Sequence, residues 1–179
     1  MLDILDKVLI IGNAESALKK KRDLSKYTKI VRINKGFPVG KEEYIGHRTH
    51  FLATSTLFSP YDIAKYYGDV YIFWMTPKEI WARGVHEKFY EQNAFFYPRR
   101  RWDILRRVLK ARPTTGCMTI DTFAGAFNCK IDILGFDWLK TRTWYWGNDR
   151  RERVEKLYNW KAEEEFVRAH KNINKIIGG

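Results

Sequence analysis

Polar residues that could bind a ligand stand at the ends of two predicted strands near the start of the chain. Gly12 and Asn13 end the run KVLIIGN, where a glycine lets a ligand approach the backbone and a carboxamide can donate and accept hydrogen bonds. Arg32 and Asn34 end the run TKIVRIN and are expected on one face, because side chains alternate along a strand. A buried strand has little reason to carry two polar groups on one face unless a partner meets them.

A third polar group, Thr114, Thr115 and Gly116, follows a proline and precedes a predicted helix. Its hydroxyl and backbone N–H groups would converge at a helix N-terminus, which favours an anion, whereas the alternative is an ordinary helix cap. The Gly-Asn loop lacks both the G-x-G-x-x-G spacing of dinucleotide-binding loops and the P-loop pattern. The sequence therefore gives no support to NAD or ATP chemistry.

Strands alternate with helices along the chain, and this alternation must position the polar groups. It predicts a single α/β domain over residues 1–179, with a Rossmann-like layered fold and a largely parallel sheet that binds ligands at the carboxyl ends of its strands. The expected strands are 7–13, 28–34, 49–55, 69–75 and 130–138, and the expected helices are 14–22, 60–67, one starting at 77, 103–111, 114–127 and 150–171.

The 179 residues carry 33 Lys and Arg against 21 Asp and Glu, a net charge of +12 that favours anionic partners. The densest basic run, PRRRWDILRRVLK, has apolar residues at helical spacing, which favours a solvated helix face over a nucleic-acid surface. No zinc-finger, RNP or KH pattern is present. A basic nucleic-acid-binding module is therefore the least favoured function.

No apolar stretch approaches the roughly 20 residues of a membrane span, and the first residues do not form a secretory signal. We therefore expect no membrane span and a cytoplasmic location. Cys117 and Cys129 are too few for a disulfide framework and are expected as free thiols, and no spacing suggests a metal site.

The segments that hold the polar groups resemble the motifs of glycosyltransferase family 29, the sialyltransferases. The stretch VLIIGNAESALKKKRDLSKYTKIVRINKGFPVGKEEYIGHRTHFLATS is similar to the large sialylmotif, whose final G-x-[KR]-T element is filled by Gly46, Arg48 and Thr49. The stretch RPTTGCMTIDTFAGAFNCKIDILGFDW is similar to the small sialylmotif, with its P-[ST]-T-G start and its D-[IL]-x-G-F strand. The two segments occur in the right order and cover a little under half of the chain.

The resemblance implies an inverting, metal-independent transferase that passes sialic acid from a CMP-sugar donor to a glycan hydroxyl. It implies a variant of the nucleotide-sugar glycosyltransferase fold and no cofactor besides the donor substrate. Asn13 and Asn34 would contact the phosphate and nucleoside of CMP. The residues expected to bind the donor are Gly12, Asn13, Arg32, Asn34, Thr114, Thr115 and Gly116.

The chain departs from this family at the position of the catalytic base. The family has a histidine followed five residues later by a glutamate, and here Tyr158 precedes Glu163 at that spacing. A phenol, with a reference pKa of about 10, is a poor general base near neutrality. Tyr158 and Glu163 are the candidate catalytic residues of a weak enzyme, and the alternative is an inactive CMP-sugar or glycan-binding protein.

Two further departures concern the family's disulfide and its third motif. Val8 and Asn128 stand where the animal enzymes have the two cysteines that link the large motif to the small one, which agrees with a reducing compartment. Trp144, Tyr145 and Trp146 stand where the family has its third motif. These rings are expected either to stack on an acceptor or donor sugar or to belong to the core.

Overall fold

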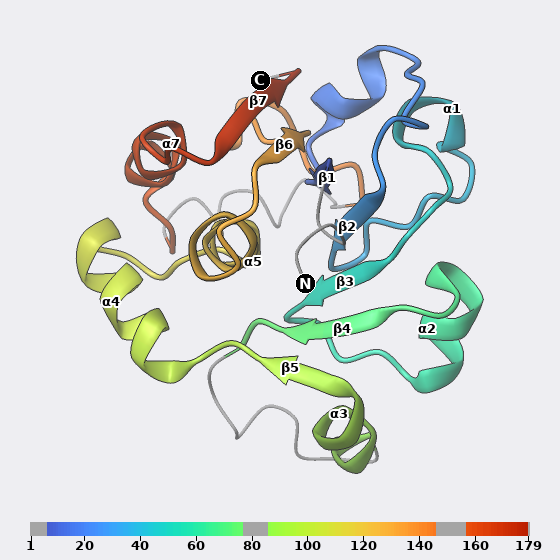
Figure 1. Ribbon diagram of the computed structural model, residues 1–179, viewed down its shortest axis with the longest axis horizontal. Coiled ribbons are helices and arrows are strands. Elements are labelled where there is room, and N and C mark those ends of the chain that lie inside the picture. Colours follow the sequence, from blue (N-terminus) through green and yellow to red (C-terminus); the bar gives the residue numbers. More distant parts are fainter. Residues whose placement is uncertain (1–6, 77–85, 146–156, 179) are drawn as a thin grey trace.

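The computed structural model describes residues 7–76, 86–145 and 157–178, and its centre is one parallel sheet (Figure 1). The strand order is β5-β4-β3-β2-β1-β6-β7, and every neighbouring pair is parallel. This arrangement confirms the predicted α/β fold with a parallel sheet. The strands are β1 (Val8–Ile11), β2 (Lys29–Ile33), β3 (Phe51–Thr54), β4 (Tyr71–Trp74), β5 (Ala94–Phe96), β6 (Ile131–Leu134) and β7 (Ile173–Ile177).

The two central strands are apolar runs because both of their faces are covered. All four residues of β1 and all four of β6 are buried, and Val8 pairs with Lys29 on one side and with Ile131 on the other. Covered parallel strands read as continuous apolar runs rather than as alternating patterns. The first strand therefore sits where its sequence predicts, in the middle of the sheet.

Helices cover the sheet on both faces, as Figure 1 shows. On one face, α4, α5 and α7 pack on Val8, Ile10 and Ile133 through one apolar cluster. On the other face, two clusters join the sheet to η2 and α1 and to α2 and α3. The helices are η2 (Glu15–Lys19), α1 (Glu42–Ile45), α2 (Pro60–Tyr67), α3 (Glu87–Asn93), α4 (Arg99–Leu109), α5 (Thr115–Ile120), η4 (Asp121–Ala126) and α7 (Trp160–Arg168).

The helix expected over 14–22 is only a short 3₁₀ helix, η2. Its entry is fixed by tertiary contacts, because Ala14 forms a β-bridge with Thr143 and the Glu15 amide donates to the Arg142 carbonyl. At its exit, Arg22 donates to the Ala17 carbonyl at 2.6 Å. These contacts override the helical propensity of the segment.

The helix expected over 150–171 is much shorter in the described residues. α7 begins at Trp160, because Asn159 caps it by accepting a hydrogen bond from the Ala162 amide at 3.1 Å. Tyr158 therefore lies just before α7 and not on it, and residues 150–156 lie outside the described part. Strands β5 and β7 were not predicted, and the helix expected to start at 77 falls on residues 77–85, which are not described.

Other expected helices are present with shifted boundaries. α4 starts at Arg99, four residues before the predicted start, and the helix expected over 114–127 is α5 followed by the π-helical η4. Both predicted free thiols, Cys117 and Cys129, are unpaired and buried. None of the helices in the described ranges is both long enough and apolar enough to cross a membrane.

Candidate functional site

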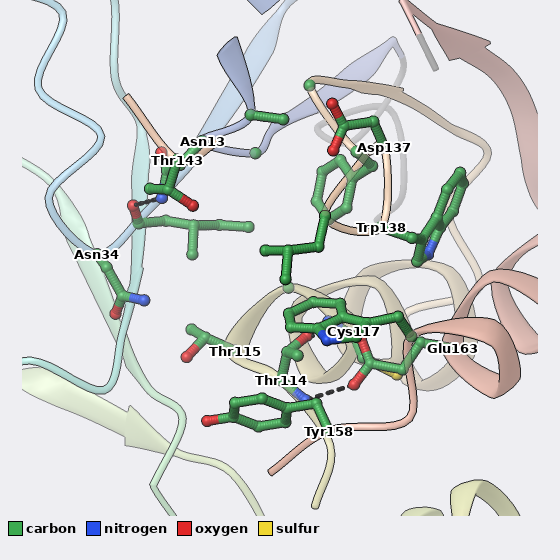
Figure 2. Close-up of a pocket in the computed structure, with 18 of the residues that line it drawn as sticks. Asn13, Asn34, Thr114, Thr115, Cys117, Asp137, Trp138, Thr143, Tyr158 and Glu163 are labelled. Atoms are coloured by element: carbon green, nitrogen blue, oxygen red, sulfur yellow. Dashed lines mark hydrogen bonds between the residues drawn. The ribbon is translucent and has the colours of Figure 1, made fainter. Parts of the chain in front are cut away.

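A cavity of about 570 Å³ opens at the carboxyl ends of β1, β2, β3 and β6 (Figure 2). Residues from both polar segments line it, although Asn34 and Thr114 are far apart in the sequence. The structure therefore brings the predicted ligand-binding groups to one place. The predicted residues at this cavity are Gly12, Asn13, Asn34, Thr114, Thr115, Gly116, Tyr145, Tyr158 and Glu163.

Gly12 sits where the loops after β1 and β6 pass each other closely. A Cβ atom at this position would lie 2.4 Å from the Gly135 carbonyl oxygen and 3.0 Å from the Phe136 ring. The Gly12 amide also donates to the Leu134 carbonyl at 2.7 Å. The glycine is thus required by the close approach of two backbones.

The Asn13 carboxamide is engaged by the protein itself through its nitrogen. Its Nδ2 donates to the Ile33 carbonyl at 2.8 Å and to the Tyr145 hydroxyl at 3.2 Å, so it ties the loop after β1 to the end of β2 (Figure 2). Its Oδ1 is buried, and a Cβ atom at Gly36 would lie 2.5 Å from it. Asn13 therefore shapes the cavity by holding two loops together.

Asn34 lies just beyond β2 with a positive φ of 48°. Its Oδ1 accepts a hydrogen bond from the Ser55 amide at 2.8 Å, and its carbonyl accepts one from the Tyr67 hydroxyl. This geometry leaves the carboxamide nitrogen facing the cavity in Figure 2. Asn34 can therefore donate to an oxygen atom of a ligand.

The start of α5 contributes two hydroxyl groups. Thr114 caps the helix, because its Oγ1 accepts from the Cys117 amide at 3.0 Å. Thr115 Oγ1 lies 2.8 Å from Ser55 Oγ across the cavity wall, and either oxygen can donate. A Cβ atom at Gly116 would lie 2.8 Å from the Phe136 ring, so Gly116 keeps this wall closely packed.

Glu163 reaches from α7 to the same wall. Its Oε1 accepts from the Thr114 amide at 2.7 Å and its Oε2 from the Thr114 hydroxyl at 2.8 Å. The side chain is buried, and this burial raises its pKa to about 7, although the two hydrogen bonds from Thr114 oppose the rise. The carboxyl group can therefore change its charge near neutral pH.

Tyr158 lines the cavity close to Thr114 and Thr115 in Figure 2. Its ring packs against Trp160, with 5.5 Å between the ring centroids. The residue at the expected position of the base thus faces the cavity, although the helix that was expected to carry it starts two residues later.

Arg32, which was expected among the donor-binding residues, does not line the cavity. The side chain is 1% exposed, and it donates to Thr49 Oγ1 at 2.9 Å and to the Gly46 carbonyl at 2.7 Å. Arg32 Nη2, which donates to Gly46, also donates to the carbonyls of Ile45 and Arg48. Burial lowers the pKa of Arg32 to about 10. The guanidinium group satisfies the carbonyls of the loop before β3, which is a structural role.

The predicted aromatic cluster separates. Tyr145 lines the cavity and accepts the hydrogen bond from Asn13, whereas Trp144 packs against the apolar cluster beside β1 and is not among the lining residues. The Trp144 amide donates to the Asn13 carbonyl at 3.1 Å, so the backbone of this loop is tied to the loop after β1. Trp146 lies outside the described residues.

Several lining residues were not predicted. Ser55 was within reach of the sequence, because it ends the predicted strand THFLATS at the edge where the ligand groups gather. Other unpredicted residues come from the loop after β6, for example Trp138, Leu139 and Thr143. Over the described ranges, His, Cys, Asp and Glu side chains form no group of three or more that could hold a metal ion.

No family model matches the sequence, and no curated protein matches it. Solved sialyltransferase structures are similar to the fold. A mammalian sialyltransferase in complex with Gal-beta-1-3GalNAc-ortho-nitrophenol superposes with a TM-score of 0.63 at 16% sequence identity, over 97% of this chain and 70% of that one.

A second similar fold is that of the sialyltransferase CstII from Campylobacter jejuni in complex with the substrate analogue cytidine-5'-monophosphate. It superposes with a TM-score of 0.61 at 17% identity, over 97% of this chain and 80% of that one. Monomeric CstII gives a TM-score of 0.59 at 18% identity, over 96% and 81% of the two chains. This chain therefore has a sialyltransferase-like glycosyltransferase fold.

Proposed function

We propose that this protein transfers sialic acid, or a related sugar, from a CMP-sugar donor to a hydroxyl group of a glycan. The transfer is inverting and needs no metal ion, as in glycosyltransferase family 29, which the two sequence motifs resemble. The observation that carries the proposal is the meeting of these two motifs at one cavity. The fold supports it, because the similar structures include a sialyltransferase in complex with CMP.

The cavity suits a nucleotide in size and in polarity. Its volume of about 570 Å³ lies within the roughly 300–1,000 Å³ of small-molecule sites. The Asn34 amide and the Thr115 hydroxyl can donate hydrogen bonds to phosphate or ribose oxygens. The protein's net charge of +12 also attracts an anionic nucleotide.

Transfer also requires a group that removes the proton of the acceptor hydroxyl. Tyr158 faces the cavity at the position of this base, but a tyrosine is a weaker base than a histidine near neutral pH. Glu163 holds Thr114 with both of its oxygens, so it positions the donor wall. We therefore propose that the protein binds the donor normally and transfers the sugar slowly.

Binding of CMP tests the donor site. CMP should raise the melting temperature, since a ligand that binds only the folded state stabilises it, whereas AMP should raise it less. Thr115→Val removes one hydroxyl from the cavity wall and should weaken CMP binding about fivefold to tenfold by the loss of one hydrogen bond.

The matched control for this variant is Thr28→Val, which makes the same change just before β2. Thr28 lies at the amino ends of the strands, whereas the cavity lies at their carboxyl ends. It should bind CMP like the wild type. The donor-site proposal is wrong if CMP leaves the melting temperature unchanged, or if the two variants bind CMP equally well.

The alternative function is a CMP-sugar or glycan-binding protein without transfer activity, and the tyrosine at position 158 favours it. The two functions differ in one measurement, which is the release of CMP from a CMP-sugar in the presence of an acceptor glycan. CMP binding without any release would favour the binding protein. Tight, salt-sensitive binding of a single-stranded oligonucleotide without a response to CMP would instead favour a nucleic-acid-binding module.

A further inference from the structure

A second hollow of about 630 Å³ adjoins the donor cavity, between the end of α4 and the start of α7. We call it the basic groove. Three residues, Leu157, Tyr158 and Trp160, line both the donor cavity and the groove. A molecule in the groove therefore reaches the donor cavity at the candidate base. The residues lining the basic groove are Arg106, Lys110, Ala111, Arg112, Leu157, Tyr158, Asn159, Trp160 and Lys161.

Among the described residues that line the groove, four carry a cationic side chain and none carries a carboxylate. Arg106, Lys110, Arg112 and Lys161 are all exposed, and within the described ranges none of them forms an ion pair. The carboxylate of Asp103 lies in the adjoining hollow, where Arg99 engages it at 3.3 Å. Cations gathered without a carboxylate among the described lining residues favour an anionic ligand.

Other arginines of the same helix are used differently. Arg101 is held by the buried carboxylate of Asp121 and serves the packing of α4 on η4. Arg106 instead stacks over the Trp102 ring, 5.7 Å from its centroid, and keeps its guanidinium group at the groove. Within the described residues, no ion pair therefore neutralises the positive charge of the groove.

Contacts between the Asn159 side chain and backbone atoms hold the groove in shape. The Asn159 side chain donates to the Leu109 carbonyl at 3.1 Å and also caps α7, so it joins the two helices that form the walls. Lys110 ends α4 in the left-handed conformation with φ 54°, which turns the chain toward Arg112 and the donor wall at Thr114. The groove is thus a built feature beside the donor site.

We propose that the basic groove binds an anionic group of the acceptor, so that the acceptor is a phosphorylated or carboxylated sugar rather than a neutral one. This inference rests on the proposed transfer function, because it assigns the second substrate of the same site. An acceptor held by its anionic group in the groove places a neighbouring hydroxyl at Tyr158, the residue that the groove and the donor cavity share.

Binding of matched small sugars tests the groove. Galactose, galactose 6-phosphate and galacturonic acid are titrated calorimetrically at low salt, each with saturating CMP. We expect at least one of the two acids to bind ~10-fold more tightly than galactose, and the tighter acid identifies the anionic group as phosphate or carboxylate.

The variant Arg112→Gln with Lys161→Gln removes two charges from the groove and should abolish this preference. Its control, Lys130→Gln with Lys171→Gln, removes two exposed charges just before β6 and before β7, at the opposite edge of the sheet. The control should keep the preference. Melting temperatures without ligand confirm that both variants are folded.

The proposal is overturned if the acids bind no better than galactose, or if both double variants lose the preference equally. It is also overturned if an oligothymidine displaces the acid from the groove at much lower concentration, because the groove would then serve nucleic acid. The CMP-induced rise in melting temperature is measured in parallel on each protein. A groove-dependent preference without any response to CMP would support the groove and refute the proposed donor.

Discussion

Replacement of Glu163 by glutamine tests the consequence of burying this carboxyl group. The pKa of Glu163 is about 7 in the folded protein, against 4.5 for an ordinary glutamate. Between these values the folded state keeps a proton that the unfolded state has lost, so the stability of the wild type falls as the pH rises. The full difference corresponds to roughly 3 kcal/mol, because a tenfold change in proton affinity is worth about 1.4 kcal/mol.

The glutamine does not titrate and can keep the local contacts. Its amide oxygen can accept from the Thr114 amide, and its nitrogen can donate to the Thr114 hydroxyl. The difference in free energy of unfolding between Glu163→Gln and the wild type should therefore shift in favour of the variant by roughly 2–3 kcal/mol when the pH is raised from 5 to 8. Urea unfolding followed by tryptophan fluorescence at the two pH values measures this difference.

Glu164→Gln is the matched control, one residue along the same helix. Partial burial would raise the pKa of Glu164, but hydrogen bonds from Arg168 and Lys140 lower it overall. The stabilisation from the charged Glu164 is lost only as the pH falls below the ordinary range for glutamate. The free energy of unfolding of Glu164→Gln relative to the wild type should therefore change little between pH 5 and pH 8. The reasoning about Glu163 is refuted if wild type and Glu163→Gln show the same dependence on pH.

Two further variants test the base position and the closest backbone approach. Tyr158→His restores the base of the resembled family and should raise the rate of CMP release from a CMP-sugar at least roughly tenfold, since general base catalysis is worth about 10²–10⁴-fold. Equal rates in the two proteins would count against position 158 as the site of the base. Gly12→Ala places a methyl group 2.4 Å from the Gly135 carbonyl oxygen and should lower the free energy of unfolding by on the order of 2–3 kcal/mol. Gly125→Ala, where the nearest atom is 3.5 Å away, should have a much smaller effect in the same urea titration.

The central sheet could be predicted because strands buried on both faces have continuous apolar sequences. β1 and β6 are continuous apolar runs, and their order along the chain with the helices fixes a parallel sheet. The apolar pattern of β7 is weaker, since Asn174 and Lys175 interrupt its apolar residues and β7 is the outermost strand of the sheet. A strand paired on only one side can be polar where it meets solvent, and its pattern then resembles a loop.

The cavity could be predicted in part for a topological reason. Asn13, Asn34 and Thr115 each follow a strand or precede a helix, and parallel strands end at one edge, so the sequence alone places them together. The role of Arg32 could not be predicted, because its carbonyl partners belong to a loop whose path the sequence does not reveal. The contact of Glu163 with Thr114 was equally hidden, since the two residues are 49 positions apart.

The amide and hydroxyl links around the cavity determine how a ligand would enter it. Asn13 fixes the end of β2, Asn34 fixes Ser55 after β3, and Ser55 contacts Thr115 at the start of α5. The loops after β1, β2 and β3 are therefore joined to one another and to α5 before any ligand arrives. These walls lose little conformational entropy on binding, because their loops are already ordered. Association with a nucleotide should then proceed in one kinetic step, with a rate constant proportional to ligand concentration and without a slower phase from closure of these loops.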